Sequence, residues 1–282
     1  MMSTIPSAAA PGAPAPFDSA RHPSSRETPD LPAVRLIRAY LLEARCETLQ
    51  ALRTPAAAIP FLAIPAAIYL LFGVVLFTPG EDTAAMPGLE NYIFSGFMVI
   101  AVAMPGLFGG CAVAFERDAG LLKLKRALPM PGGANLVAKA AMSMMFAAAA
   151  SGSVVAIAVA ADTITLSGAQ VAVMWGVMIA GTVPFCAIGL LIGSLASASS
   201  APAFANLVFL PMMWLSGLFI PLPEFLQPWV VVWPAFHLNQ VALGAGGVGD
   251  YVYVSPQLAL AVLAGITVLS GGLAIRRLSR VG

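Results

Sequence analysis

The stretch Phe115–Pro131, FERDAGLLKLKRALPMP, is a charged island between two long apolar runs. Residues 92–114 precede the island and residues 134–161 follow it, and both runs contain few polar side chains. Each ionised group at the centre of a bilayer costs several kcal/mol. The island is therefore expected to lie in water, on a loop between two helices that cross a membrane.

The same stretch predicts one short amphipathic helix on this loop. Leucines at spacings of three and four give the helix an apolar stripe that would contact a partner or the membrane surface, and prolines after its last turn end it. The order of its charges complements the helix dipole, with acids in the first turn and bases in the last. These charged residues are Glu116 and Asp118, followed by Lys123, Lys125 and Arg126.

The composition of the chain indicates an all-α integral membrane protein. Hydrophobic residues make up 59% of the sequence and charged residues 10%, whereas an average soluble domain has roughly 25% charged residues. The cysteines Cys46, Cys111 and Cys186 fall in three separate segments. The spacing of these cysteines predicts neither a disulfide framework nor a metal site.

The sequence divides into three parts. Residues 1–30, rich in Ala, Pro and Ser, predict a disordered cytoplasmic tail. Residues 31–55 predict an amphipathic connecting helix at the membrane interface, and an ordinary helix of a small soluble cap is the alternative. The apolar face of this helix carries Ile37, Leu41, Ala44, Thr48 and Leu52. Residues 56–282 predict a membrane domain with six spans.

Six apolar stretches are long enough to span a membrane, taking ~20 residues as the length that a membrane helix needs. Their predicted bounds are 56–77, 92–114, 134–161, 169–195, 201–220 and 256–274. With six spans, all 14 Lys and Arg residues lie on one side of the membrane, and the positive-inside rule then places both termini in the cytoplasm. Gly189, Gly193 and Ser197 form a ridge of small residues that is typical of a helix-packing face.

Residues 223–255, between the fifth and sixth spans, are apolar but interrupted by prolines. Segments of this length predict short re-entrant helices in the outer leaflet. Trp229, Trp233, Tyr251 and Tyr253 would then form an aromatic belt. The alternative is a loop that covers the ends of the helices.

The predicted spans lack the chemistry of an ion-coupled transporter or an ATPase. No ionisable residue lies near the middle of a span, and Lys139 is close enough to a cytoplasmic end to snorkel into water. The sequence contains no P-loop motif. His237, with Glu224 or Asp250, suggests a membrane-embedded enzyme as an alternative. A helical bundle without an internal energy source instead predicts a transport subunit driven by a separate partner.

Several motifs, taken in order, resemble the membrane subunit of ABC type-2 exporters. Residues 52–55, Leu-Arg-Thr-Pro, are similar to a Leu-Arg-Asn-Pro step in relatives. Residues 116–129 resemble the family's Glu-Arg-Glu-x-Gly-Thr-Leu-x-x-Leu-x-x-x-Pro loop, with Asp118 in place of the commoner Glu and Leu121 in place of Thr. Residues 215–223 are similar to the Ser-Gly-x-x-x-Pro-x-x-x-x-Pro ending of the fifth span, with the second proline early. The resemblance covers about residue 36 to the C-terminus.

The resemblance implies particular partners and site residues. It implies a dimer, either of two copies of this chain or of this chain and a paralogue, in contact with membrane lipid and seated on two ATP-binding cassette ATPases. The ATPases would bind ATP and Mg, this chain would bind no cofactor, and nucleic acid is not implied. The implied ATPase-coupling residues are Arg38, Arg45, Glu116, Arg117, Asp118, Gly120, Lys123, Lys125 and Arg126.

The resemblance also implies that the second and fifth spans face the dimer axis and line the substrate path. The path residues would be Phe94, Met98, Met104, Phe108, Asn206, Met212, Met213, Trp214 and Ser216. Thioethers and aromatic rings suit a hydrophobic or amphiphilic cargo, and ordinary helix packing is the alternative role for them.

We therefore expect a permease of the bacterial inner membrane that exports a drug-like or lipid molecule. The alternatives are export of a lipid-linked polysaccharide, an enzyme or scaffold acting through the outer loop, and a self-standing channel.

Overall fold

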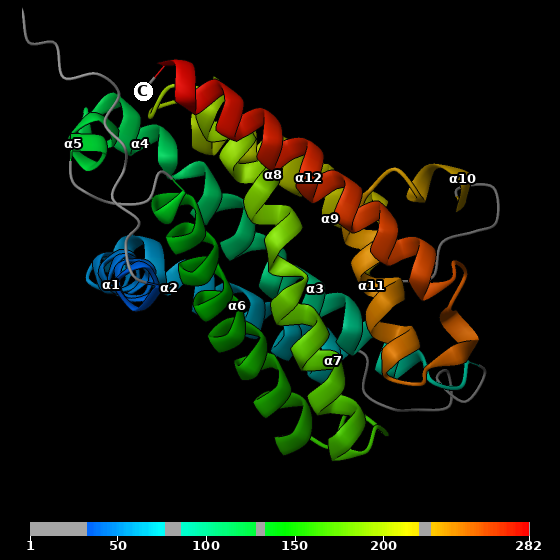
Figure 1. The fold of residues 1–282 in the computed structure, drawn as a ribbon. Helices are drawn as coiled ribbons and strands as arrows, with labels where there is room; N and C mark the ends of the chain where they lie inside the picture. The colour runs from blue at the N-terminus through cyan, green and yellow to red at the C-terminus, as the bar shows by residue number, and fades with distance from the viewer. Residues whose placement is uncertain (1–32, 77–85, 128–132, 220–226, 282) are drawn as a thin grey trace, which may run out of the picture.

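The computed structural model of the chain describes residues 33–76, 86–127, 133–219 and 227–281 (Figure 1). The described residues form helices, turns and short connections and contain no strand. The predicted tail at 1–30 lies outside the described residues, as do the prolines at 129, 131, 221 and 223.

The helices follow the order of the apolar stretches in the sequence. The elements are α1 (Ala33–Leu52), α2 (Pro55–Tyr69), the π-helix η1 (Leu70–Leu76), α3 (Leu89–Cys111), α4 (Val113–Asp118), α5 (Leu121–Ala127), α6 (Ala134–Ala160), α7 (Gly168–Ala180), α8 (Thr182–Leu195), α9 (Ala201–Leu215), α10 (Gln227–Val230), α11 (Pro234–Ala245), the 3-10 helix η4 (Gly249–Tyr251) and α12 (Pro256–Val281).

Five helical segments of the described chain are long and apolar enough to cross a membrane. They are Ala58–Leu76, Leu89–Asp118, Ala134–Ala160, Gly168–Leu195 and Pro256–Arg280. They correspond to five of the six predicted spans.

The predicted fifth span, 201–220, contains the shorter helix α9, which has 15 residues. A helix of this length extends about 22 Å, less than the ~30 Å thickness of the hydrocarbon core. Gly217 adopts a left-handed conformation with φ 67°, which glycine tolerates and which ends helices. The hydroxyl of Tyr92, at the start of α3, donates a hydrogen bond to the Gly217 carbonyl. Residues 201–217 therefore reach the end of the bundle at which α3 begins.

Helix α3 forms the centre of the bundle, and nearly all its residues are buried. It packs against α8 and α6, and also against α2, α9 and α11. Glycines allow the backbones of α3 and α8 to approach closely, because a Cβ atom on Gly189 would clash with the Leu107 carbonyl and one on Gly193 with the Cys111 carbonyl. The predicted packing role of these two glycines is confirmed.

The two ends of the bundle differ in charge. We call the end that carries α1, α4, α5 and the C-terminal part of α12 the basic end, and the opposite end the acidic end (Figure 1). Every Lys and Arg residue in the described part of the chain belongs to one of these elements, to their adjoining turns or, for Lys139, to the first turns of α6. At the acidic end, three side-chain hydrogen bonds join segments that are distant in the chain. They link Asn91 to Thr165, Gln170 to Gly246, and Tyr251 to Pro87.

The charged island forms two helices, so the prediction of one short helix is wrong. Helix α4 follows directly on α3 and ends at Asp118. Gly120 then takes a left-handed conformation with φ 72°, and α5 begins at Leu121. Glu116 and Asp118 therefore lie at the end of a long α3–α4 unit instead of in the first turn of a loop helix.

Helix α1 lies across the bundle, since Figure 1 views it almost along its axis while α6 and α12 are seen from the side. It packs against α6, and Glu47 and Thr48 are buried on this side. Ile37 and Leu41, on the predicted apolar face, are 58% and 66% exposed. Contact of this face with lipid stays a prediction.

Two short helices, α10 and α11, follow α9 in the described chain. Helix α11 packs against α12, α7 and α3. His237 in α11 is only 4% exposed, and its Nε2 atom lies 2.8 Å from the Val231 carbonyl oxygen. His237 is thus a buried helical residue, in contrast to the loop residue that the sequence suggested. Trp229 is 71% exposed, whereas Tyr251 is buried, so the predicted aromatic belt is only partly at the surface.

Candidate functional site

A buried lysine brings α1, α4 and α6 together at the basic end. Lys139 of α6 is only 2% exposed. Its Nζ atom lies 2.8 Å from Oε1 of Glu116 and 3.1 Å from Oε2 of Glu47. The prediction that Lys139 snorkels into water is wrong, because the carboxylates of two neighbouring helices pair with its ammonium group inside the protein.

A second lysine extends this network to α5. Nζ of Lys125 lies 2.8 Å from Glu43, 2.6 Å from Glu47 and 3.2 Å from Glu116. Asn135 accepts a 2.8 Å hydrogen bond from Lys125 and donates a 2.9 Å hydrogen bond to Oε2 of Glu116. We call Glu43, Glu47, Glu116, Lys125, Asn135 and Lys139 the ion-pair cluster.

The ion-pair cluster holds its helices in fixed relative positions. Glu47 and Glu116 are each 6% exposed, and an unpaired charge at such a site is strongly unfavourable. Removing one partner of a buried pair costs ~3–5 kcal/mol. Helices α1, α4, α5 and α6 are therefore expected to move together if any of them is displaced.

The electrostatics of Lys125 reflect the same contacts. Burial lowers the pKa of its ammonium group, but hydrogen bonds to Glu43 and Glu47 and the negative charges of Glu116 and Glu47 raise it by more. The pKa of Lys125 therefore lies above its usual range, and the residue remains charged at physiological pH.

Arg117 connects α4 to the end of α8. Its Nη1 donates hydrogen bonds to the carbonyls of Gly193 and Ser194 at 3.1 and 2.9 Å, and its Nη2 donates to Ala196 at 2.7 Å. These are carbonyls at the C-terminal end of α8, which lack partners within the helix and which a cation stabilises. Arg277 of α12 donates a further 3.0 Å hydrogen bond to Ser194.

Asp118 stabilises the same contact from the other side. Its Oδ1 accepts two hydrogen bonds from the Arg117 guanidinium, at 3.1 and 2.9 Å. Its Oδ2 accepts a 2.7 Å hydrogen bond from the Ala198 amide, between α8 and α9. The neighbouring residues Arg117 and Asp118 thus join the charged island to α8 and to the connection that leads into α9.

The predicted coupling residues do not form one surface. Glu116 and Lys125 belong to the ion-pair cluster, Arg117 and Asp118 contact the end of α8, and Gly120 forms the turn between α4 and α5. Arg38, Arg45 and Lys123 are exposed, and the side chain of Arg126 lies outside the described residues. Sequence reasoning missed Glu43, Glu47, Asn135, Lys139 and Arg277. The spacing of four between Glu43 and Glu47, which places two carboxylates on one helix face, was the available signal.

The predicted path residues differ in burial. Most are buried inside the chain or half-buried, where they pack among its own helices, and only two are exposed. Phe94, Met98, Met212, Met213 and Ser216 are buried, Met104 and Phe108 are half-buried, and Asn206 and Trp214 are exposed.

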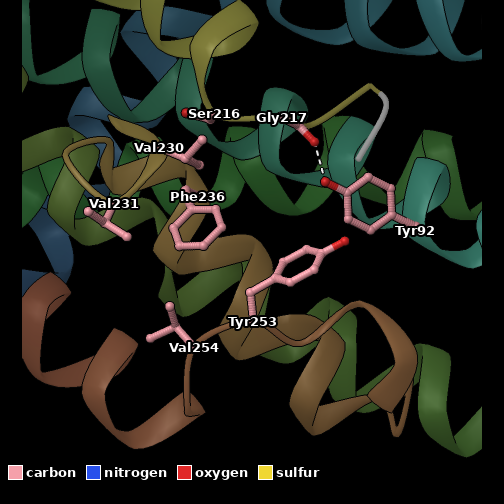
Figure 2. Close-up of a pocket in the computed structure, with 8 residues that line it drawn as sticks. All are labelled: Tyr92, Ser216, Gly217, Val230, Val231, Phe236, Tyr253 and Val254. Atoms are coloured by element: carbon pink, nitrogen blue, oxygen red, sulfur yellow. Dashed lines mark hydrogen bonds between the residues drawn. The ribbon is translucent and has the colours of Figure 1, made fainter. Parts of the chain in front are cut away.

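Two cavities lie near these residues. The larger, of about 570 Å³, is at the basic end beside the ion-pair cluster and includes Phe108 in its wall. The smaller, of about 200 Å³, is near the acidic end and includes Tyr92, Ser216, Phe236 and Tyr253 (Figure 2). Figure 2 shows Tyr253 extending toward Tyr92, whose hydroxyl is hydrogen-bonded to Gly217. Among the described residues, the buried Ser216 hydroxyl has no hydrogen-bond partner.

The fold and the site together define a class of protein. Apolar helices of spanning length, with charged residues gathered at the two ends of the bundle, define a multi-pass integral membrane protein. Within the described part of the chain, no group of three His, Cys, Asp or Glu side chains is arranged to hold a metal ion.

Comparison with protein families identifies the particular kind of membrane protein. The family model for ABC-2 type transporters matches residues 40–247, well over half of the chain. The chain belongs to this family and is the membrane permease component of an ABC transporter. Members of the family typically function with an ATPase subunit. A search of curated proteins gives no match to the chain. The resemblance seen in the order of the sequence motifs is confirmed.

Proposed function

We propose that the chain is the permease of an exporter in the bacterial inner membrane. It moves a hydrophobic or amphiphilic molecule, drug-like or lipid, out of the cytoplasm. A separate ATPase subunit binds ATP and Mg and supplies the energy. The observation that carries this proposal is the ion-pair cluster, which joins α1 and α5 at the basic end to the helices α3–α4 and α6.

The ion-pair cluster would transmit a displacement of α1 or α5 to the α3–α4 unit and to α6. A partner that displaces α1 or α5 must also displace Glu116 and Lys139, because separating the buried charges is strongly unfavourable. Glu116 lies at the end of the long α3–α4 unit, and Lys139 lies near the start of α6. Arg117 would pass the same displacement to α8, because its guanidinium donates hydrogen bonds to two carbonyls of that helix.

The basic end is the proposed docking surface for the ATPase. Lys and Arg residues prefer the cytoplasmic side of a membrane, so the charge distribution supports a cytoplasmic basic end with both termini in the cytoplasm. Arg38, Arg45 and Lys123 are exposed there. Charges at the edge of an interface steer and orient a partner more than they add affinity.

A second copy of the chain completes the proposed transporter. The α9 surface exposes Phe204, Leu207, Leu210 and Trp214, which recur at helical spacing on one face. This face suits contact with another apolar helix or with lipid. Asn206 and Trp214 would face the substrate path between the two copies.

The proposal is tested by reconstituting the chain with the ATPase encoded beside it and measuring ATP-dependent export of a panel of amphiphiles from proteoliposomes. The native pair is expected to export at least one of them. Glu47→Gln, which weakens the cluster, is expected to reduce export more than ATPase binding. Glu90→Gln at the acidic end is the matched control. Export that needs no ATPase, or that Glu47→Gln leaves at the native rate, contradicts the proposal.

A further inference from the structure

The larger cavity lies within a single copy of the chain, beside the ion-pair cluster. Its volume of about 570 Å³ is within the ~300–1,000 Å³ of typical small-molecule sites. Its walls come from α1, α2, the α3–α4 unit, α5 and α6, with one residue from α9. The cavity is lined by Glu47, Gln50, Phe61, Phe108, Glu116 and Met142, among other residues.

One part of the cavity is apolar. The rings of Phe61 and Phe108 have centroids 6.3 Å apart, and Met142 lies in the same wall. Aromatic rings and thioethers adapt to apolar ligands of varied shape. This part of the cavity suits the hydrocarbon body of an amphiphile.

The other part of the cavity is charged, and its charges do not balance. Glu47, Glu116 and Lys139 line it directly. The pairs made by these residues extend to Glu43 and Lys125, so three carboxylates face two ammonium groups. Among the side chains that the structure describes, these pairs therefore leave one negative charge without a matching positive charge. A cation at this position would balance it, whereas an anion would add repulsion in a poorly solvated site.

We propose that this cavity binds a cationic amphiphile, with its charged head beside Glu47 and Glu116 and its apolar body among Phe61, Phe108 and Met142. The proposal deepens the proposed function, on which it rests for the identification of the ligand as cargo. A ligand in this cavity touches the residues that join α1 to α3–α4 and α6. Binding of the ligand and the transmission of movement from α1 to these helices therefore depend on the same side chains.

Gln50 allows a test that leaves the ion-pair cluster intact. It is exposed and lines the cavity, and it is not a member of the cluster. Gln50→Lys adds a positive charge at the cavity wall, and Gln50→Glu adds a negative one. Leu49→Lys is the matched control, because Leu49 is the neighbouring residue of α1, is 38% exposed and does not line the cavity.

The experiment measures binding of a fluorescent alkylammonium probe to the purified full-length chain in a neutral maltoside detergent, by fluorescence anisotropy. Alkyl alcohol and alkyl sulfate probes with the same chain and fluorophore test the head-group preference. We expect the alkylammonium probe to bind about tenfold more tightly than the other two. Gln50→Lys should weaken its binding about three- to tenfold, and Gln50→Glu should strengthen it by a similar factor, because one charge has been added nearby. Leu49→Lys should leave binding within about twofold of native.

A second variant tests the apolar part. Met142→Trp should fill part of the cavity and reduce binding of the alkylammonium probe, while Val137→Trp, on the exposed side of the same helix, should not. Equal binding of the three head groups overturns the proposal, as does an effect of Leu49→Lys as large as that of Gln50→Lys. Preference for the alkyl sulfate probe identifies an anionic-ligand site and also overturns it.

This binding assay requires no ATPase. Failure of the ATPase to associate with the chain would therefore contradict the proposed function while leaving a measured head-group preference in place. Loss of the head-group preference would contradict the cationic site while leaving ATP-dependent export in place.

Discussion

The Nζ atom of Lys139 lies 2.8 Å from Oε1 of Glu116, and both residues are almost completely buried. This pair joins α6 to the end of the α3–α4 unit. Glu47 contacts the same ammonium group from α1 at 3.1 Å, and Lys125 contacts both carboxylates from α5. The strength of each contact therefore depends on the presence of the others.

We first predict a strong energetic coupling between Lys139 and Glu116. Lys139→Met leaves two buried carboxylates with fewer partners and should lower the stability by ~3–5 kcal/mol. The double variant Lys139→Met with Glu116→Gln should lose less than the sum of the two single variants. Thermal unfolding in detergent measures these differences, and Lys123→Met, at an exposed lysine, is the control. Additive losses would contradict a direct interaction.

Replacement of Arg117 tests the contact between α4 and α8. Arg117→Ala removes hydrogen bonds to three carbonyls and should cost ~1–3 kcal/mol. Arg117→Lys should restore only part of this loss, because an ammonium group cannot reproduce the planar, forked geometry of guanidinium. The unfolding temperature and the hydrogen-exchange protection of 190–200 are the measurements. Full recovery with lysine would show that charge alone is sufficient.

The raised pKa of Lys125 predicts a dependence on alkaline pH. Its partners favour the charged form in the folded state, so its contribution to stability is complete below the unfolded pKa, ~10.4. That contribution is lost as the pH rises toward the higher pKa of the folded state. The stability difference between native protein and Lys125→Gln should thus be constant from about pH 7 to about pH 9.5 and shrink above ~10.4.

Lys123→Gln is the control, because it removes one positive charge from α5 without removing the contacts of Lys125. If the difference between native protein and Lys125→Gln instead grew with pH above ~10.4, the sign of the pKa shift would be wrong.

Close packing of α3 on α8 predicts a severe effect of adding one methyl group. A Cβ atom at Gly189 would clash with the backbone carbonyl of Leu107, and such overpacking costs ~1–3 kcal/mol or more. Gly176→Ala is the matched control, since a Cβ atom there meets no neighbour within 4 Å and alanine favours helix. Gly189→Ala should lower the yield of folded protein, and Gly176→Ala should maintain or raise it. Equal yields would argue against close α3–α8 packing.

Sequence reasoning predicted the helical class, five of the long apolar segments and the family, because these depend on apolar length and on motifs that are local in the chain. It predicted α9 to be longer than it is. The left-handed Gly217 ends that helix, and the Ser-Gly pair at 216–217 was a local signal for this ending. Gly120 similarly divides the charged island into two helices.

The candidate site could be predicted only in part. The sequence identified Glu116 and Lys125 as functional, but it placed them on a water-exposed docking loop. Their ion pairs inside the protein depend on Glu47 and Lys139, which are 92 positions apart in the chain. The spacing of Glu43 and Glu47 indicates that α1 has an acidic face, but it does not indicate which lysines pair with that face. The packing of α1 on α6 identifies these partners.

Docking of the ATPase at the basic end is tested by copurification of the neighbouring ATPase with the native chain and with a variant carrying Arg38→Glu, Arg45→Glu and Lys123→Glu. These three residues are exposed at the basic end and lie outside the ion-pair cluster, so the variant should retain the native unfolding temperature. We predict that the native chain retains the ATPase and that the variant loses most of it. Equal retention of the ATPase by both proteins, or by neither, would contradict docking at the basic end.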